Sequence, residues 1–196
     1  MIRIAILGST RGTNLNAVVA AIKQQRLPAS IELVLSNKAD APILEKASQF
    51  GLKSLFINPQ GLSRSDFDHS LSEILSQHRI ELIVLIGYMR ILSAEFVLNW
   101  ENKIINIHPS LLPAYAGLMN LDVHQAVLDG AEHETGCTVH FVTEQVDAGP
   151  IILQKKCPVL AGDTPELLKT RVQELEGDAL IEAKYTIATS DKAPYK

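Results

Sequence analysis

Short apolar runs rich in β-branched residues alternate along this sequence with stretches whose apolar residues recur at helical spacing. The first four apolar runs are residues 2–8, 31–36, 53–57 and 81–87. Strands that are covered on both faces have such nearly continuous apolar character. The stretch 14–27 instead repeats its apolar residues at i, i+3, i+4 and i+7, as an amphipathic helix does. Strands that alternate with helices form βαβ units, so the pattern predicts an α/β fold with a largely parallel sheet.

The second half of the chain continues this alternation. Ser93 can cap a short helix at 94–100, and Thr164 followed by Pro165 can open a helix that runs through residue 176. The other predicted elements are helices at 41–51, 66–78 and 122–128, a strand at the start of 103–115, and strands at 136–143 and 150–159. We therefore expect a single domain over residues 1–196, with a mostly parallel twisted sheet of about seven strands and helices on both faces, a Rossmann-like arrangement. Residues 186–196 are predicted to be a frayed tail.

Composition and charge argue against several classes of partner. The chain has 196 residues, 46% of them apolar, and a net charge of −4 without a basic cluster, which argues against nucleic acid. No apolar run reaches the ~18 residues of a membrane span, and the apolar start at 1–8 is too short for a signal peptide, so we expect a cytoplasmic protein. Cys137 and Cys157 are too few for a disulfide framework and lack a CxxC metal spacing. The expected partners are small molecules, without a metal, and the expected assembly is a monomer or a homodimer.

The loop "GSTRGTNL" at 8–15 joins the first strand to the first helix, where backbone N–H groups and the helix dipole can hold an anion. It has neither a G-x-G-x-x-G fingerprint nor a Walker-type Gly-Lys-Ser/Thr. The second strand ends in Ser36 and Asn37 rather than in the acid that would hold a ribose, so the sequence argues against NAD and ATP. A plain tight turn with Asn14 as helix cap explains the loop equally well.

Two polar residues, Asn106 and His108, stand at the end of the apolar strand in "KIINIHPSLLPAY". Positions i and i+2 of a strand point to one face, while Ile105 and Ile107 point to the other. Ligands bind at the carboxyl ends of strands in doubly wound sheets, so this pair is a candidate for catalysis. The alternative is a hydrogen-bonded core histidine and a turn asparagine. His124 and His140 are weaker candidates.

Asp147 stands in "QVDAGPI", between the last two predicted strands. Aspartate is common in such turns, so a purely structural role is a strong alternative. If the loop folds over the strand that carries Asn106 and His108, the carboxylate could hold the His108 imidazole or a water and raise the pKa of that histidine toward working pH. Only proximity in three dimensions can decide between the two.

These pieces together resemble the glycinamide ribonucleotide formyltransferase family of purine biosynthesis. The motifs that carry the resemblance are "GSTRGTNL", "GYMRILS" at 87–93, "NIHPSLLP" at 106–113 and "GCTVHFVTEQVDAGPIILQ" at 136–154. They occur in family order over the first 176 residues or so of the chain. "NIHPSLLP" is also shared by methionyl-tRNA and sugar-nucleotide formyltransferases and by formyltetrahydrofolate hydrolase. The first and last of these normally carry an extra domain, so the length of the chain favours the ribonucleotide enzyme over them. A nucleotide-binding module without catalysis is the alternative from another class.

The resemblance implies that Asn106 stabilises an oxyanion, that His108 acts as general acid and base, and that Asp147 supports both, with 10-formyltetrahydrofolate as cosubstrate and no metal. It implies a ribonucleotide site in the half 1–100 and a catalytic, folate-binding half at 101–185. The implied ribonucleotide-binding residues are Gly12, Thr13, Asn14, Arg64 and Glu176. The implied folate-binding residues are Met89, Arg90, Ile91, Leu92, Phe141, Val142 and Thr143.

The chain departs from the family pattern at three places. Thr10 replaces the first glycine of the usual phosphate loop. Many members carry two histidines after the Gly-Leu pair, whereas this chain has "GLMNLDVHQ", which leaves only His124. The acid Glu176 is followed by "GDALIEA" rather than by His and then Tyr-Pro.

Overall fold

The strands form one sheet in the order β3-β2-β1-β4-β5-β6-β7. The computed structural model describes residues 1–189, with side chains described to residue 183. Strands β1 to β5 are parallel, whereas β6 is antiparallel to both β5 and β7. The strands are β1 (Ile2–Leu7), β2 (Ala29–Ser36), β3 (Ser54–Phe56), β4 (Leu82–Leu85), β5 (Ile104–His108), β6 (Glu134–Phe141) and β7 (Ile151–Pro158). The predicted mostly parallel sheet is therefore confirmed.

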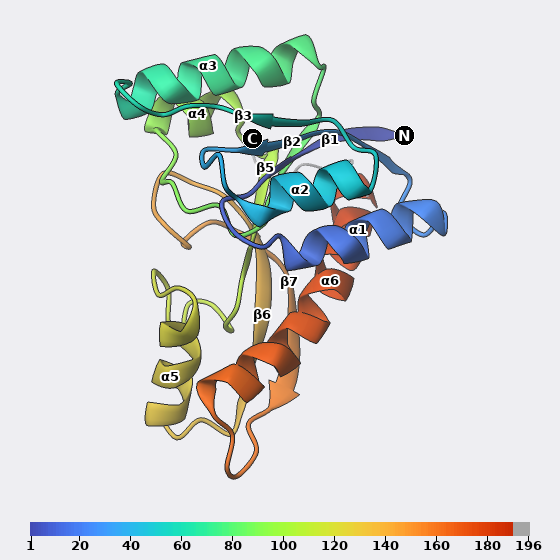
Figure 1. The fold of residues 1–196 in the computed structure, drawn as a ribbon. Coiled ribbons are helices and arrows are strands. Elements are labelled where there is room, and N and C mark those ends of the chain that lie inside the picture. Colours follow the sequence, from blue (N-terminus) through green and yellow to red (C-terminus); the bar gives the residue numbers. More distant parts are fainter. Residues whose placement is uncertain (190–196) are drawn as a thin grey trace.

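Helices cover both faces of the sheet (Figure 1). Helices α1, α2 and α6 pack on one face and α3 and α4 on the other, while α5 contacts α6. The helices are α1 (Thr13–Lys23), α2 (Pro42–Gln49), α3 (Arg64–Gln77), α4 (Ala94–Asn99), α5 (Leu121–Asp129) and α6 (Pro165–Thr189). Helix α6 reaches into the segment predicted as a tail at 186–196, and residues 190–196 of that segment lie outside the described part of the chain.

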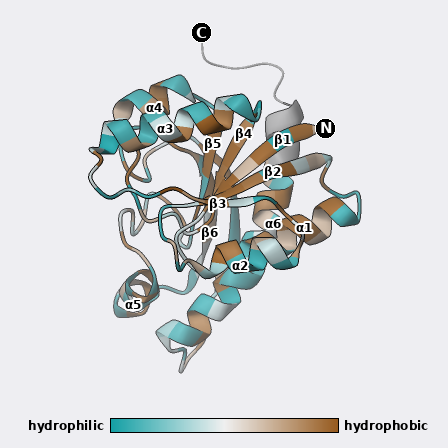
Figure 2. Cartoon of the chain, turned by 45° about the horizontal axis from the view of Figure 1, so that its top comes forward, coloured by the Kyte–Doolittle hydropathy of each residue, from teal (hydrophilic) through white to brown (hydrophobic). Residues whose placement is uncertain are grey.

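Successive side chains of a strand point to opposite faces of the sheet, so the strands contribute to two separate hydrophobic cores. In β1, Ile4 and Ile6 join the core beneath α1, α2 and α6, whereas Ala5 and Leu7 join the core beneath α3 and α4. Each large apolar side chain that is fully buried contributes about 1.5–3 kcal/mol. Figure 2 shows this distribution, with hydrophobic strands at the centre and helices around them that carry both hydrophobic and hydrophilic residues. The nearly continuous apolar strands are therefore covered by helices on both faces, as the sequence predicts.

The start of α6 was predicted correctly, but the helix does not end near residue 176. Leu167 donates its backbone N–H to Thr164 Oγ1 at 3.4 Å, as a capping threonine requires. Beyond Glu176 the sequence contains Gly177, which favours a break in an isolated helix. A Cβ added to Gly177 would lie 2.5 Å from Ala17 Cβ of α1, so the missing side chain lets the two helices approach closely. Tertiary contact therefore overrides local propensity at this position.

The parallel strands β1, β4 and β5 end at the same edge of the sheet. Strand β1 lies between β2 and β4, so the strand order reverses between β1 and β4. In open α/β sheets the crevice at such a reversal is where ligands bind. The loops after β1 and β4 and the end of β5 therefore face one shared space.

Candidate active site

A cavity of about 860 Å³ opens at this edge of the sheet. Its walls come from the loops after β1 and β4, the end of β5, the loop before α5, the β6–β7 loop, and one face of α6. The cavity brings together most of the residues singled out in the sequence. Those that line it are Gly12, Thr13, Asn14, Met89, Arg90, Ile91, Leu92, Asn106, His108, Val142, Thr143, Asp147 and Glu176.

Asn106 forms a cross-strand pair with His140 of β6. The two residues are directly opposite in the antiparallel register, and Asn106 Nδ2 lies 3.2 Å from His140 Nε2. His140 Nδ1 lies 2.9 Å from the Phe141 carbonyl oxygen, which can only accept, so Nδ1 carries the proton. When Nε2 carries no proton, it accepts a hydrogen bond from Asn106 Nδ2. The second N–H of that amide is left to donate to a ligand in the cavity.

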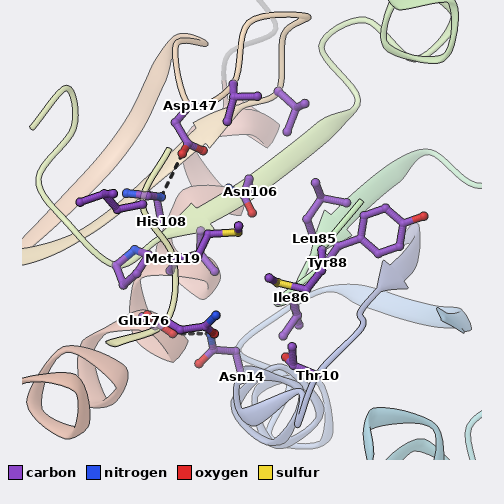
Figure 3. Close-up of a pocket in the computed structure, with 18 of the residues that line it drawn as sticks. Thr10, Asn14, Leu85, Ile86, Tyr88, Asn106, His108, Met119, Asp147 and Glu176 are labelled. Carbon is purple, nitrogen blue, oxygen red and sulfur yellow. Dashed lines mark hydrogen bonds and ion pairs between the residues drawn. The ribbon is translucent and has the colours of Figure 1, made fainter. Parts of the chain in front are cut away.

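His108 is buried, with each ring nitrogen near a protein acceptor. Nε2 lies 3.2 Å from the carbonyl oxygen of Tyr115, and Nδ1 lies 3.3 Å from Asp147 Oδ2 (Figure 3). This geometry suits the protonated ring, but burial favours the neutral one. Burial is the larger effect and lowers the pKa of His108, although Asp147 and the Tyr115 carbonyl act to raise it. The contact with Asp147 is thus present and acts to raise the pKa of His108, as expected, but burial outweighs the carboxylate and the pKa is lowered overall.

Asp147 joins three parts of the site. Its Oδ2 accepts a hydrogen bond from the Gly117 backbone N–H at 2.9 Å, and its Oδ1 lies 3.6 Å from His140 Nε2. The residue has a φ of 54°, a left-handed conformation that aspartate tolerates better than most residues. Burial alone would raise the pKa of Asp147, but His140, the Gly117 amide and His108 together hold it below its usual value. The carboxylate is therefore ionised at neutral pH and fixes the β6–β7 loop over the end of β5.

The loop after β1 has the form of an anion site. Gly12 is the N-cap of α1 with a φ of 59°, and a Cβ there would lie 2.4 Å from Ile43 Cγ1, so only glycine fits. Within the described part of the chain, the N–H groups of Thr13 and Asn14 have no hydrogen-bond acceptor. The interpretation of Asn14 as helix cap is wrong, because Gly12 holds that position without a side-chain cap. The Thr10 hydroxyl packs against Gly87, and a Cβ added to Gly87 would lie 2.3 Å from Thr10 Oγ1.

Glu176 reaches the cavity from α6. Asn14 Nδ2 donates to Glu176 Oε2 at 2.6 Å (Figure 3). Burial raises the pKa of Glu176, while Asn14 and Lys169 oppose that rise. The acid predicted from the family pattern is therefore located beside the loop predicted to hold the phosphate.

The segment Met89–Leu92 forms the opposite wall. Ser9 fixes it, because the Met89 N–H donates to Ser9 Oγ at 2.9 Å. The Arg90 guanidinium lies 4.3 Å from the centre of the Phe67 ring. Two predicted contacts do not line the cavity: Arg64 is exposed at the start of α3, and Phe141 lies at the end of β6.

A family model described as formyl transferase matches residues 2–184. The chain belongs to the formyl transferase family. It is 41% identical over 174 residues to the phosphoribosylglycinamide formyltransferase of Escherichia coli, an alignment that includes 88% of this chain and 81% of that protein. The resemblance drawn from the motifs is therefore confirmed.

Two further relatives agree with this assignment. The chain is 46% identical over 189 residues to the trifunctional purine biosynthetic protein adenosine-3 of Gallus gallus, and the match covers 96% of this chain but only 18% of that protein. Among solved structures, glycinamide ribonucleotide transformylase 1 from Symbiobacterium toebii superposes with a TM-score of 0.89 at 43% identity, over 93% of this chain and 85% of that one.

In this member of the formyl transferase family, sequence reasoning missed two parts of the site. His140 was given little weight because only the β5–β6 register shows that it faces Asn106. Ser9 was not singled out, since its role depends on a contact 80 residues away. Among the described residues, no group of three or more His, Cys, Asp and Glu side chains is placed to hold a metal ion, and none of the helices is long and apolar enough to cross a membrane.

Proposed function

We propose that this protein transfers a formyl group from 10-formyltetrahydrofolate to the amine of glycinamide ribonucleotide, as a step of purine biosynthesis in the cytoplasm. The observation that carries the proposal is the cluster of Asn106, His108 and Asp147 in one cavity with the loop Gly12–Asn14. The cavity thus offers a candidate phosphate site and a candidate acyl-transfer site together. The similarity to named phosphoribosylglycinamide formyltransferases supports this choice of substrate.

The reaction requires a donor for an oxyanion and a group that manages protons. The substrate amine attacks the formyl carbon and forms a C–N bond, which gives a tetrahedral carbon bearing an oxyanion. The bond from that carbon to N10 of the folate then breaks, the amine nitrogen loses a proton and N10 gains one. A hydrogen-bond donor at the oxyanion contributes about 3–4 kcal/mol, and a general acid or base contributes about 10² to 10⁴ in rate.

The three residues suit these tasks. One N–H of the Asn106 amide faces His140, so the other N–H of the same amide can donate to the oxyanion. His108 is neutral over most of the neutral pH range because burial lowers its pKa, so it can accept the proton of the attacking amine. Asp147 stabilises the imidazolium that forms. The proton can then pass to N10 of the departing folate.

The two substrates would occupy opposite sides of the cavity. The N–H groups of Thr13 and Asn14 suit the phosphate, because they lie at the positive end of the α1 dipole. The exposed apolar side chain of Ile91, together with Met89 and Leu92, gives the other side an apolar surface for the folate. Arg64 remains a predicted ribonucleotide contact outside the cavity.

The proposal is tested by incubating the pure protein with 10-formyltetrahydrofolate and glycinamide ribonucleotide, with an amino sugar nucleotide in a parallel reaction. We expect formylated ribonucleotide by mass spectrometry and equimolar release of tetrahydrofolate. Formylation of the sugar nucleotide alone, or hydrolysis of the folate without transfer, would refute the proposal. Loss of transfer in His108→Ala, with the same circular dichroism spectrum, excludes a contaminating enzyme.

A further inference from the structure

Side chains outside the cavity hold the loop that follows His108. This loop, residues 109–120, has no helix or strand between β5 and α5. Its residues Ser110 and Leu112 are buried, and so is Thr138 of β6, which lies directly opposite His108 in the strand register. Buried backbone groups outside helices and strands need hydrogen-bond partners from elsewhere. The side chains that supply these partners therefore determine the course of the loop.

The hydroxyl of Thr138 is the centre of a buried network. It donates to the Ser110 carbonyl oxygen at 2.7 Å, and it accepts from the Leu112 N–H at 3.0 Å and from Gln154 Nε2 at 2.9 Å. A hydroxyl group has one hydrogen to donate and two lone pairs that accept, so its hydrogen-bonding capacity is fully used. Thr138 thus joins two residues of the loop to strand β7.

Gln154 of β7 binds the same loop a second time. Its Nε2 also donates to the Leu112 carbonyl oxygen at 2.9 Å, so the amide nitrogen has two acceptors for its two hydrogens. Further along the loop, Ser110 Oγ donates to the Ala114 carbonyl oxygen at 2.6 Å. Side chains therefore hold the loop backbone at Ser110, Leu112 and Ala114, the last of which directly precedes Tyr115.

Tyr115 is the point where this loop reaches the catalytic residues. Its carbonyl oxygen lies 3.2 Å from His108 Nε2. Its φ of 62° is a left-handed conformation, which costs energy for a tyrosine and persists only where the surrounding structure enforces it. The side chain is held separately, because its hydroxyl donates to Glu132 Oε1 at 3.0 Å. The position of the Tyr115 carbonyl thus depends on the network that fixes the loop before it.

The other groups around His108 are charged or titratable. Asp147 and the Tyr115 carbonyl act to raise the pKa of His108, whereas burial and His140 lower it. His124 of α5 is near enough to be affected by the charge of His108, but burial lowers the pKa of His124 to about 4, so that ring is neutral at pH 7. Loss of the carbonyl contact would therefore leave Asp147 to favour the charged His108 ring against burial.

We propose that Gln154 and Thr138 are positioning residues that hold the Tyr115 carbonyl against the His108 imidazole from outside the cavity. Neither residue lines the cavity, so neither is placed to touch a substrate bound there. This inference rests on the proposed function for the reaction in which His108 takes part. When His108 accepts the proton of the attacking amine, the Tyr115 carbonyl accepts a hydrogen bond from Nε2–H of the imidazolium and stabilises it. Loss of the network therefore weakens the base without removing it.

The test measures steady-state kinetics in Gln154→Met, Thr138→Val and Thr138→Ser. Methionine and valine approximate the shapes of the native side chains but cannot make their hydrogen bonds, whereas serine keeps the hydroxyl. We expect Gln154→Met and Thr138→Val to lower kcat about tenfold with both KM values within about twofold of wild type, and Thr138→Ser to retain most of kcat. Gln125→Met, at an exposed glutamine of α5, controls for the loss of an amide.

NMR titration of the His108 ring separates positioning from a general loss of stability. The pKa of His108 should fall in Gln154→Met and in Thr138→Val, because a contact that raises it is lost, and the acid limb of kcat/KM should move to lower pH. A fall in kcat with an unchanged His108 pKa would overturn the inference. Wild-type kcat in either variant would overturn it for that residue. If Gln154→Met does not fold, the comparison of Thr138→Val with Thr138→Ser decides by the same criteria.

The NMR titration also separates this inference from the proposed function, because it requires no formyl transfer. A lower His108 pKa in both variants supports the positioning role even if the wild type fails to formylate glycinamide ribonucleotide, and then only the proposed function is refuted. If the wild type is active and both variants match it in kcat and in the His108 pKa, the proposed function stands and the role of Gln154 and Thr138 is rejected.

Discussion

The side chain of Asn14, in the first turn of α1, donates a hydrogen bond to Glu176 of α6 at 2.6 Å across 162 residues of sequence. This bond satisfies a buried carboxylate and also joins the candidate phosphate loop to the wall of the cavity. Stability and substrate binding therefore share one contact. Substitutions at its two ends should affect these properties differently.

Replacing Asn14 with leucine should lower both stability and affinity. The Glu176 carboxylate would lose its hydrogen-bond donor while still buried, which costs about 1–3 kcal/mol. We expect a lower midpoint in urea denaturation and a higher KM for the ribonucleotide, with the folate KM little changed. Asn16→Leu, an exposed asparagine of the same helix, is the matched control. If Asn14→Leu changes only the folate KM, the assignment of this loop to the phosphate is wrong.

Replacing Glu176 with glutamine should raise stability at neutral pH. Burial raises the folded-state pKa of Glu176 above its unfolded value, so ionisation disfavours the folded state once the pH exceeds these values. The stability difference between variant and wild type should shrink as the pH falls toward about 4, near the pKa of an unperturbed glutamate. Thermal unfolding from pH 4 to pH 8 measures it. A constant difference over that range would show that ionisation of Glu176 is not the cause.

Alanine at Asn106 or at His108 should abolish most formyl transfer without unfolding the protein. We expect each change to lower kcat by at least about 10²-fold, since each removes a group that acts only in the transition state. Rapid-quench measurement of a single turnover separates the chemical step from product release. Near wild-type turnover in either variant would exclude that residue from the mechanism.

The variant Asp147→Asn should lower the pKa of His108 further. Burial and His140 lower this pKa, whereas the Asp147 carboxylate and the Tyr115 carbonyl raise it. Without the negative charge of Asp147, only the Tyr115 carbonyl still acts against burial. NMR titration of the His108 ring should show the shift, and the acid limb of kcat/KM should move to lower pH. Glu144→Gln, an exposed carboxylate in the same loop, should change neither. An upward shift of the His108 pKa in Asp147→Asn would contradict the contact.

Alanine at Gly177 should separate α6 from α1. The new Cβ would lie 2.5 Å from Ala17 Cβ, so the helices must move apart, at a cost of about 1–3 kcal/mol. Ala17→Gly in the same chain should restore much of this loss because it removes the opposing methyl group. Denaturation of the two single variants and the double variant gives the free energies of unfolding for a double-mutant cycle. Additive effects of the two changes would show that these positions do not meet.

The sequence predicted the parts of this protein that depend on local pattern. Nearly continuous apolar runs identified the strands and helical spacing identified most helices, because each pattern reflects which faces of an element must be buried. The i, i+2 spacing likewise placed Asn106 and His108 on one face of β5. The motifs and their order along the chain also indicated the family, because both can be read directly from the sequence.

Only the tertiary structure decided what depends on contact between distant segments. The pairing of His140 with Asn106 follows from strand register, and the bond from Asn14 to Glu176 follows from the approach of α6 to α1 at Gly177. The direction of the His108 pKa shift depends on burial, which is a sum over all surrounding elements and has no local signature. The sequence alone thus determined the fold class and the chemical groups, whereas three-dimensional packing decided which groups meet and which charge state they favour.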